Sequence, residues 1–302
     1  MKQDKSLFIF FTFIIRLSTA LVKPRCYNKA MNAFIELLKA LLLGLIQGIT
    51  EWLPVSSTGH LILMETFWPF ELSEAFSDLF IVFIQVGSVL AVLLLFYKTL
   101  NPLSGSVAHR HNSLILWLKI VVASVPAGIL GILFDDMVDA VLYKPWIIAV
   151  ALVVYGIAFI VVERMALPVK TSRLNDISFT QAFGIGSFQV LSLVPGTSRS
   201  GSTILGALIL GLSRPVAAEF SFMMAIPVLL GAGAIKLVKS GMAFSGLEWM
   251  VLAVGFITAF VVSLAVMRAL MAYVKKHRFT PFAYYRIGLG LVILVLVSFQ
   301  VL

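Results

Sequence analysis

The chain has 302 residues, 60% of them hydrophobic and 12% charged, and its mean hydropathy is +1.03. Soluble globular domains are about 45–50% apolar and about 25% charged, and disordered chains are poor in apolar residues, so both classes are excluded. Since about 20 apolar residues cross a bilayer as one helix, the length allows about six to nine crossings.

The formal net charge of +9 does not indicate a nucleic-acid partner. Lysine and arginine gather in the cytoplasmic loops of membrane proteins, and no stretch of this chain interleaves basic and aromatic residues on a polar surface. Residues 1–30 hold six basic residues and one acidic residue, so they carry more than half of the excess charge. Cys26 is the single cysteine, which excludes an intrachain disulfide and a cysteine-based metal site.

Nine apolar segments follow one another along the chain. The first, 7–22, is a signal-peptide core, an extra span, or a stretch ahead of a second start at Met31, and these three interpretations stay open. We therefore treat residues 1–30 as an N-terminal extension of uncertain role and 31–302 as one integral-membrane domain. The other eight segments are 34–50, 79–97, 114–134, 146–162, 179–194, 216–235, 247–270 and 282–302.

Two further apolar pieces, 61–70 and 203–213, are too short to cross a hydrocarbon core of about 30 Å. Each follows a polar stretch with proline and glycine, and irregular backbone at membrane depth is tolerated only where it is buried or lines a wet cavity. These pieces predict half-helices or re-entrant hairpins around a site.

The loop charges predict an orientation, because basic loops stay inside. The loops 98–113, 163–178 and 268–278 are predicted to be cytoplasmic. The loops 135–145 and 239–246, and with them the C-terminus, are predicted to be external.

Two similar motifs suggest a duplication. LPVSSTGH at 53–60 and VPGTSRSGST at 194–203 place Pro54 and Pro195 141 residues apart, and a glutamine precedes each motif. Ordinary Pro-Ser-Gly turn chemistry is the alternative. Paired broken helices in an apolar chain are typical of inverted-repeat membrane folds with the site at the repeat interface. We predict an all-α polytopic membrane protein with two inverted-topology repeats, approximately 31–145 and 146–302, containing re-entrant or half helices.

The first motif places chemistry at membrane depth. Gln47 and Glu51 share one helix face, and the helix is expected to end at Pro54. A carboxylate inside a membrane is costly and indicates a functional site, although Glu51 alone has a structural alternative as the partner of an arginine. Four further side chains that fall in the break are Ser56, Ser57, Thr58 and His60. For the histidine, capping a helix is the alternative.

The second motif resembles a phosphate cradle. Gly196 and Gly201 let backbone N–H groups approach a ligand, and Arg199 offers a planar fork suited to phosphate. The apolar run from Thr203 predicts a helix whose N-terminus favours an anion. Anchoring of the arginine to lipid headgroups is the alternative. Further hydroxyl donors are Ser198, Ser200 and Ser202.

A third charged position is Arg286, which enters the otherwise uncharged last span. It is expected either to reach the same cavity or to extend to the membrane interface. The assembled groups suit phosphoryl transfer, which needs charge stabilisation, a nucleophile and a proton donor. Hard divalent cations prefer carboxylate and phosphate oxygens, so Glu51, helped by Gln47, is the predicted ligand of Mg²⁺ or Ca²⁺.

The motifs QGITEWLPVSSTGH at 47–60 and PGTSRSGST at 195–203, with VGFITAFVV at 254–262 and PFAYYR at 281–286, resemble those of the undecaprenyl-diphosphate phosphatases, the bacitracin-resistance proteins. The resemblance runs from about Met31 to the C-terminus. It implies hydrolysis of undecaprenyl diphosphate to the monophosphate carrier of peptidoglycan synthesis, and a divalent cation. It also implies a bacterial inner-membrane location with an outward-facing site and a possible homodimer.

By position, the resemblance implies that Glu51, Ser57, His60, Ser198, Arg199 and Thr203 are functional. Gln47 removes one carboxylate of the family's first motif, which puts a two-carboxylate metal site in doubt. We expect Ser57 to be the nucleophile with His60 as acid/base. Attack by the histidine, or by a metal-bound water, stays open.

Two other function classes compete with this prediction. A transporter or flippase of a phosphorylated lipid would also use inverted repeats and a phosphate-binding site. A lipid phosphatase of the acid-phosphatase type would need a histidine after Ser198 and Arg199, and the next one is the distant His277.

Overall fold

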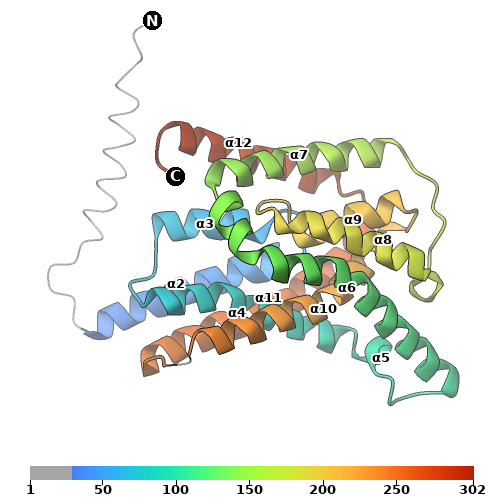
Figure 1. Ribbon diagram of the computed structural model, residues 1–302, viewed down its shortest axis with the longest axis horizontal. Helices are drawn as coiled ribbons and strands as arrows, with labels where there is room; N and C mark the ends of the chain where they lie inside the picture. Colours follow the sequence, from blue (N-terminus) through green and yellow to red (C-terminus); the bar gives the residue numbers. More distant parts are fainter. Residues whose placement is uncertain (1–28, 242) are drawn as a thin grey trace, which may run out of the picture.

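The computed structural model describes residues 29–241 and 243–302 (Figure 1). The predicted segment 7–22 and Cys26 therefore lie outside the described residues. Within the described ranges the chain is helical, and only an isolated bridge between Thr171 and Leu212 has β-type pairing. The fold class, an all-α polytopic membrane protein, is thereby confirmed.

Seven described helices are long and apolar enough to cross a membrane. They are α2 (Lys29–Thr50), α4 (Glu74–Leu95), α6 (Val107–Leu142, apolar over Val107–Phe134), α7 (Pro145–Arg164), α10 (Arg214–Lys239), α11 (Gly246–Val274) and α12 (Thr280–Ser298). The shorter ones are α3 (Ser57–Phe67), α5 (Tyr97–Leu100), α8 (Phe179–Val190) and α9 (Arg199–Ile209), with 3₁₀ turns η1 (Leu174–Asp176) and η2 (Leu191–Leu193).

The two predicted half-helices are present as α3 and α9, of 11 residues each. Each begins after a serine with positive φ, 72° at Ser56 and 73° at Ser198. Both serine side chains cap their helix by accepting a hydrogen bond from a backbone N–H, of Gly59 and Gly201 respectively. Because the caps are 142 residues apart, the motifs align one residue away from the register that the two prolines suggested.

Helix α9 begins at Arg199, four residues before the predicted start at Thr203. The sequence suggested the later start because the apolar run begins there. The capping serine, which satisfies an otherwise free N–H of the first turn, decides the real boundary.

The predicted external loop at 135–145 is wrong over most of its length, since α6 continues to Leu142. The segment contains neither glycine nor proline, so its acidic residues do not end the helix. Only Tyr143 and Lys144 separate α6 from α7, whose first residue is Pro145, a favoured position for proline.

The elements of the two halves interlock (Figure 1). Helix α11 packs against α2 and α4, α6 against α8, α4 against α10, and α7 against α12. In Figure 1 the connection from α3 to α4 lies at the left end and the connection from α7 to α8 at the right end. This arrangement supports a duplication in which each half covers the half-helix hairpin of the other. The opposite membrane orientation of the halves stays a prediction.

Candidate active site

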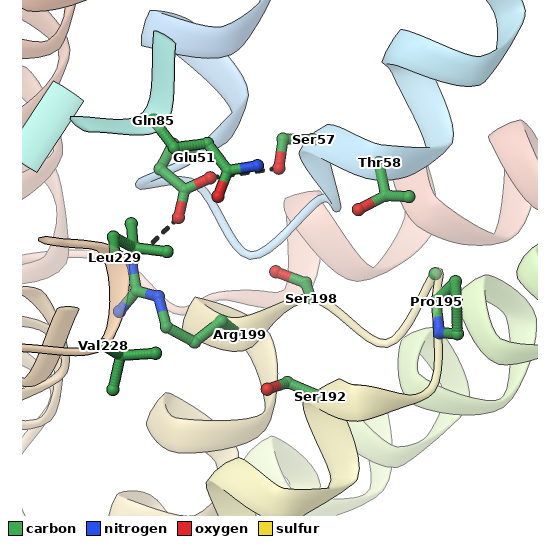
Figure 2. Close-up of a pocket in the computed structure, with 11 residues that line it drawn as sticks. Glu51, Ser57, Thr58, Gln85, Ser192, Pro195, Ser198, Arg199, Val228 and Leu229 are labelled. Carbon is green, nitrogen blue, oxygen red and sulfur yellow. Dashed lines mark hydrogen bonds and ion pairs between the residues drawn. The ribbon is translucent and has the colours of Figure 1, made fainter. Parts of the chain in front are cut away.

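The two chain breaks meet around one cavity of about 200 Å³ (Figure 2). The first break, between α2 and α3, contributes side chains from one wall, and the break between α8 and α9 contributes the wall opposite. Helices α4 and α10 close the remaining side. The lining residues are Glu51, Ser57, Thr58, Gln85, Ser192, Pro195, Gly196, Ser198, Arg199, Val228 and Leu229.

A buried ion pair joins the two breaks. Glu51 Oε1 lies 3.0 Å from Arg199 Nη2, and both side chains are less than 10% exposed. The arginine also donates to the carbonyl of Ser221 at 2.7 Å, and its guanidinium lies over the Trp52 ring at 5.6 Å. Since breaking a buried pair is far more costly than breaking an exposed one, this pair fixes the position of both charges.

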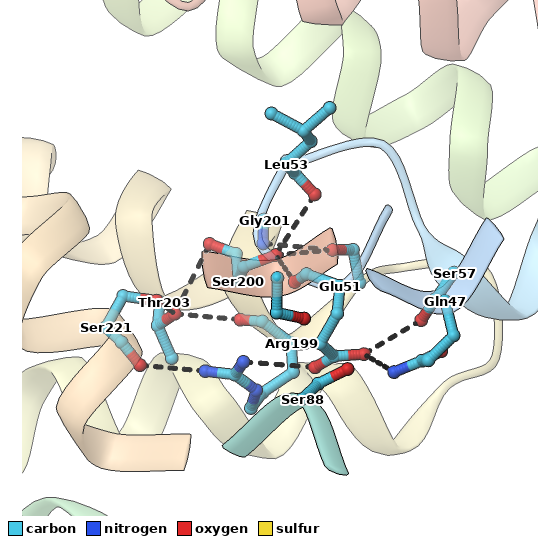
Figure 3. A network of polar contacts seen from close by, with 12 residues as sticks. Gln47, Glu51, Leu53, Ser57, Ser88, Arg199, Ser200, Gly201, Thr203 and Ser221 are labelled. Atoms are coloured by element: carbon cyan, nitrogen blue, oxygen red, sulfur yellow. Dashed lines mark hydrogen bonds and ion pairs between the residues drawn. The ribbon is translucent and has the colours of Figure 1, made fainter. Parts of the chain in front are cut away.

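The second oxygen of Glu51 accepts two hydrogen bonds (Figure 3). Ser57 Oγ donates to Glu51 Oε2 at 3.1 Å, and Gln47 Nε2 donates to the same oxygen at 3.0 Å. A hydroxyl within hydrogen-bond reach of a carboxylate base is the arrangement of an activated nucleophile. The i and i+4 spacing of Gln47 and Glu51 therefore brings them together as expected.

Four predicted phosphate-binding positions have structural roles instead, outside the cavity lining. Ser200 Oγ is within donor distance of the carbonyls of Glu51 and Leu53, at 3.0 and 3.2 Å. Thr203 Oγ1 donates to the carbonyl of Arg199 at 2.8 Å. The other two positions, Ser56 and Gly201, belong to the helix caps. Thr58, Gly196 and Ser198 are the predicted phosphate-binding residues that line the cavity.

His60 lies beside the cavity and does not line it. Its Nδ1 is 2.7 Å from the carbonyl of Ser56, and its Nε2 is 2.7 Å from the hydroxyl of Tyr285. Because a carbonyl only accepts, this network assigns the hydrogen to Nδ1 and makes Nε2 the acceptor. Both ring nitrogens are thus occupied, and the arrangement does not favour the expected acid/base role for His60.

Arg286 reaches neither of its two expected positions. Its side chain is fully buried, and it donates to the carbonyls of Pro54, Gly196 and Thr197 at 3.2, 3.0 and 2.7 Å. It therefore lies behind the cavity, away from both the lining and the interface. The sequence could not separate these cases because the depth of a side chain in a bundle depends on its neighbours.

Sequence reasoning missed two polar lining residues, Gln85 in α4 and Ser192 in η2. In Figure 2 the Gln85 side chain points toward Glu51 and Ser57. An amide inside a charge-free apolar span was a usable signal. Val228 and Leu229 offered no signal, because nothing distinguishes them from other apolar residues of a span.

The donor set for a metal ion is small. The described residues contain no group of three or more histidine, cysteine, aspartate or glutamate side chains suited to a metal. Glu51 is the single cavity carboxylate, and Gln47 Oε1 is buried without a hydrogen-bond partner. One carboxylate and one amide oxygen fit a hard cation that takes its remaining ligands from water and phosphate.

A multi-span helical protein with a hydroxyl, a carboxylate and a guanidinium gathered in a buried cavity belongs to the class of membrane proteins that act on phosphorylated groups. Residues 40–292 match the family described as bacitracin resistance protein BacA, and the chain belongs to this family.

Named relatives are similar over most of their length. The chain is 49% identical over 264 residues to "Undecaprenyl-diphosphatase 1" of Clostridioides difficile (strain 630), covering 87% of this chain and 96% of that protein. It is 48% identical over 272 residues to "Undecaprenyl-diphosphatase" of Enterococcus faecalis, covering 88% and 98%. The protein of the same name from Desulfitobacterium hafniense (strain DSM 10664 / DCB-2) is 47% identical over 271 residues, covering 88% and 98%.

Proposed function

We propose that this protein is a polyprenyl-diphosphate phosphatase that hydrolyses undecaprenyl diphosphate to undecaprenyl phosphate and inorganic phosphate. The observation that carries the proposal is the hydrogen bond from Ser57 to Glu51, next to Arg199, in the cavity where the two motifs meet. The family and the names of relatives with 47–49% identity give the substrate class.

The proposed reaction has two steps. Ser57 Oγ attacks the terminal phosphorus while Glu51 takes its proton, and the bond from phosphorus to the bridging oxygen breaks. Lipid monophosphate leaves, and water then cleaves the phosphoserine to release inorganic phosphate. Arg199 and the hydroxyls of Thr58 and Ser198 face the cavity and would stabilise charge on the phosphoryl oxygens.

The same proposal includes a Mg²⁺ or Ca²⁺ ion. Glu51 and Gln47 would hold it, and a bound cation would supply neutralisation of the negative diphosphate. The buried, unpartnered Gln47 Oε1 supports this choice, since an unsatisfied buried acceptor is costly without a ligand.

Location and assembly complete the proposal. The basic loops favour an inner-membrane orientation with the substrate entering from the outer face. A homodimer is also proposed, and light scattering of the detergent-solubilised protein would decide the oligomeric state.

Phosphate release from undecaprenyl diphosphate by detergent-purified protein, with Mg²⁺ or Ca²⁺ added, tests the function. Release that is lost in Ser57→Ala and retained in Ser187→Ala is expected, because the Ser187 hydroxyl bonds only within its own helix. Binding without release would favour a lipid transporter instead.

The nucleophile is identified by quenching the reaction with substrate labelled at the terminal phosphate and mapping the labelled peptide. A label on Ser57 is expected. A label on His60 would assign the attack to the imidazole, and no label during turnover would assign it to water.

A further inference from the structure

A buried cation without a carboxylate partner lies behind the cavity. Arg286 is fully buried in α12, and among the described residues no carboxylate is within ion-pair distance of it. Its Nε also lacks a hydrogen-bond partner. Because an unpaired buried charge is strongly disfavoured, its remaining contacts must compensate for the lost hydration.

Those contacts are three main-chain carbonyls, and they belong to both chain breaks. Nη1 donates to Pro54, in the break before α3, at 3.2 Å. Nη2 donates to Gly196 and Thr197, in the break before α9, at 3.0 and 2.7 Å. One planar guanidinium from a third element therefore ties together the two segments that form opposite walls of the cavity.

The breaks need such support, because each ends in a residue with strained backbone. Ser56 and Ser198 have φ of 72° and 73°, a region that side-chain-bearing residues rarely adopt. The next residue after each strained serine is Ser57 or Arg199, which are the proposed nucleophile and the guanidinium that faces it. A small shift of either break would therefore separate the reacting groups.

The surroundings are shaped to admit this guanidinium. A Cβ added at Gly201 would lie only 2.6 Å from Arg286 Nη1. The Tyr155 ring of α7 lies 5.5 Å from the guanidinium carbon, which adds a favourable cation–π contact. The space is thus left by a glycine on one side and closed by an aromatic ring on the other.

We propose that Arg286 is a positioning residue that holds the α3 break and the α9 break in the relative placement that catalysis needs. The inference rests on the proposed phosphatase function and goes beyond it, because Arg286 does not line the cavity. Its planar, two-pronged geometry is the property required, so a lysine at this position keeps the charge and loses the clamp.

The kinetic test compares Arg286→Met, Arg286→Lys and Gly201→Ala in the full-length, purified protein. We expect kcat to fall at least tenfold in Arg286→Met with KM changed less than threefold, and an intermediate kcat in Arg286→Lys. Gly201→Ala should reproduce the loss of kcat, since the new methyl group displaces the guanidinium. Gly288→Ala is the control, as an added Cβ there meets nothing within 4 Å.

Wild-type kcat in folded Arg286→Met or Gly201→Ala would overturn the proposal. A large rise in KM at unchanged kcat would also overturn it, because that result assigns Arg286 to substrate binding. If Arg286→Met does not insert, Gly201→Ala decides the question.

A second measurement does not depend on activity. Backbone amide hydrogen exchange should accelerate in Gly201→Ala at both 54–59 and 196–201, and remain unchanged in Gly288→Ala. Unchanged exchange at the α3 break would overturn the clamp. If wild-type protein releases no phosphate, the proposed function fails while this exchange result still judges the clamp.

Discussion

At the scale of single residues, Glu51 organises the cavity. One of its oxygens pairs with Arg199, and the other accepts from Ser57 and Gln47. A carboxylate satisfied by three donors can remain ionised where an isolated one could not. The cost of placing charge at membrane depth is thus offset by a network that also presents a hydroxyl to substrate.

Arg199→Ala tests the guanidinium side of this network. We expect about 10²–10³-fold lower phosphate release, the size of effect seen when one charge-stabilising donor is removed. Stability should fall by about 3–5 kcal/mol, because Glu51 is left buried and unpaired. Phosphate-release kinetics and thermal unfolding in detergent measure the two effects.

The matched control is Arg164→Ala, since Arg164 is exposed at the end of α7. Near-normal turnover in folded Arg199→Ala would remove this residue from the site. Arg199→Lys, which keeps the positive charge, provides an answer if the alanine variant does not insert.

Gln47→Glu tests the cation. A second carboxylate beside Glu51 should lower the half-saturating Mg²⁺ or Ca²⁺ concentration by about tenfold, since carboxylate charge strengthens binding of hard cations. Without a cation the two carboxylates repel, so the melting temperature should fall and recover when Ca²⁺ is added. Gln300→Glu adds the same charge at an exposed position and should show neither effect. Identical cation dependence in the two variants would contradict a site at Gln47 and Glu51.

At the scale of elements, glycines set the distances between helices. Gly186 in α8 faces the backbone of Ala123 in α6, and Gly44 in α2 faces the backbone of Gly255 in α11. Small residues at helix crossings let backbones approach closely, which is a main source of packing energy inside membranes. These crossings hold the half-helix hairpins against the other half of the molecule.

Gly186→Ala tests one crossing. The new methyl group would collide with Ala123 main-chain atoms, so we expect a loss of at least about 1–3 kcal/mol of stability, measured as a lower melting temperature. Gly128→Ala in α6 is the control, because its added Cβ meets nothing within 4 Å and alanine favours helix. Equal melting temperatures for the two variants would show that the crossing tolerates expansion.

At the scale of the whole molecule, the interlocking of the halves makes the cavity a shared product. Helix α6 of the first half covers α8, and α11 of the second half covers α2. Neither half-helix hairpin is enclosed by its own half alone. The loops that carry most of the basic residues of 31–302 then fall at one end of the bundle, as the orientation prediction requires.

Cysteine labelling tests that orientation in a variant with Cys26 replaced by serine. Ala243→Cys should react with a membrane-impermeant maleimide in right-side-out vesicles, and Ser104→Cys should react only after lysis, since both positions are exposed. The physical reason is the retention of basic loops on the inner side. The reverse pattern would invert the proposed direction of substrate entry.

The sequence by itself determined the membrane class, the two half-helices and the pairing of Gln47 with Glu51, because hydropathy, segment length and helical spacing are local properties. It placed the start of α9 too late and a loop inside α6, because caps and helix continuation depend on backbone hydrogen bonds that composition does not report. Tertiary structure alone decided that Thr58, Ser198 and Arg199 line one cavity while His60 and Arg286 lie behind it. Depth and direction of a side chain follow from which helices pack against it, and those contacts join residues more than a hundred positions apart.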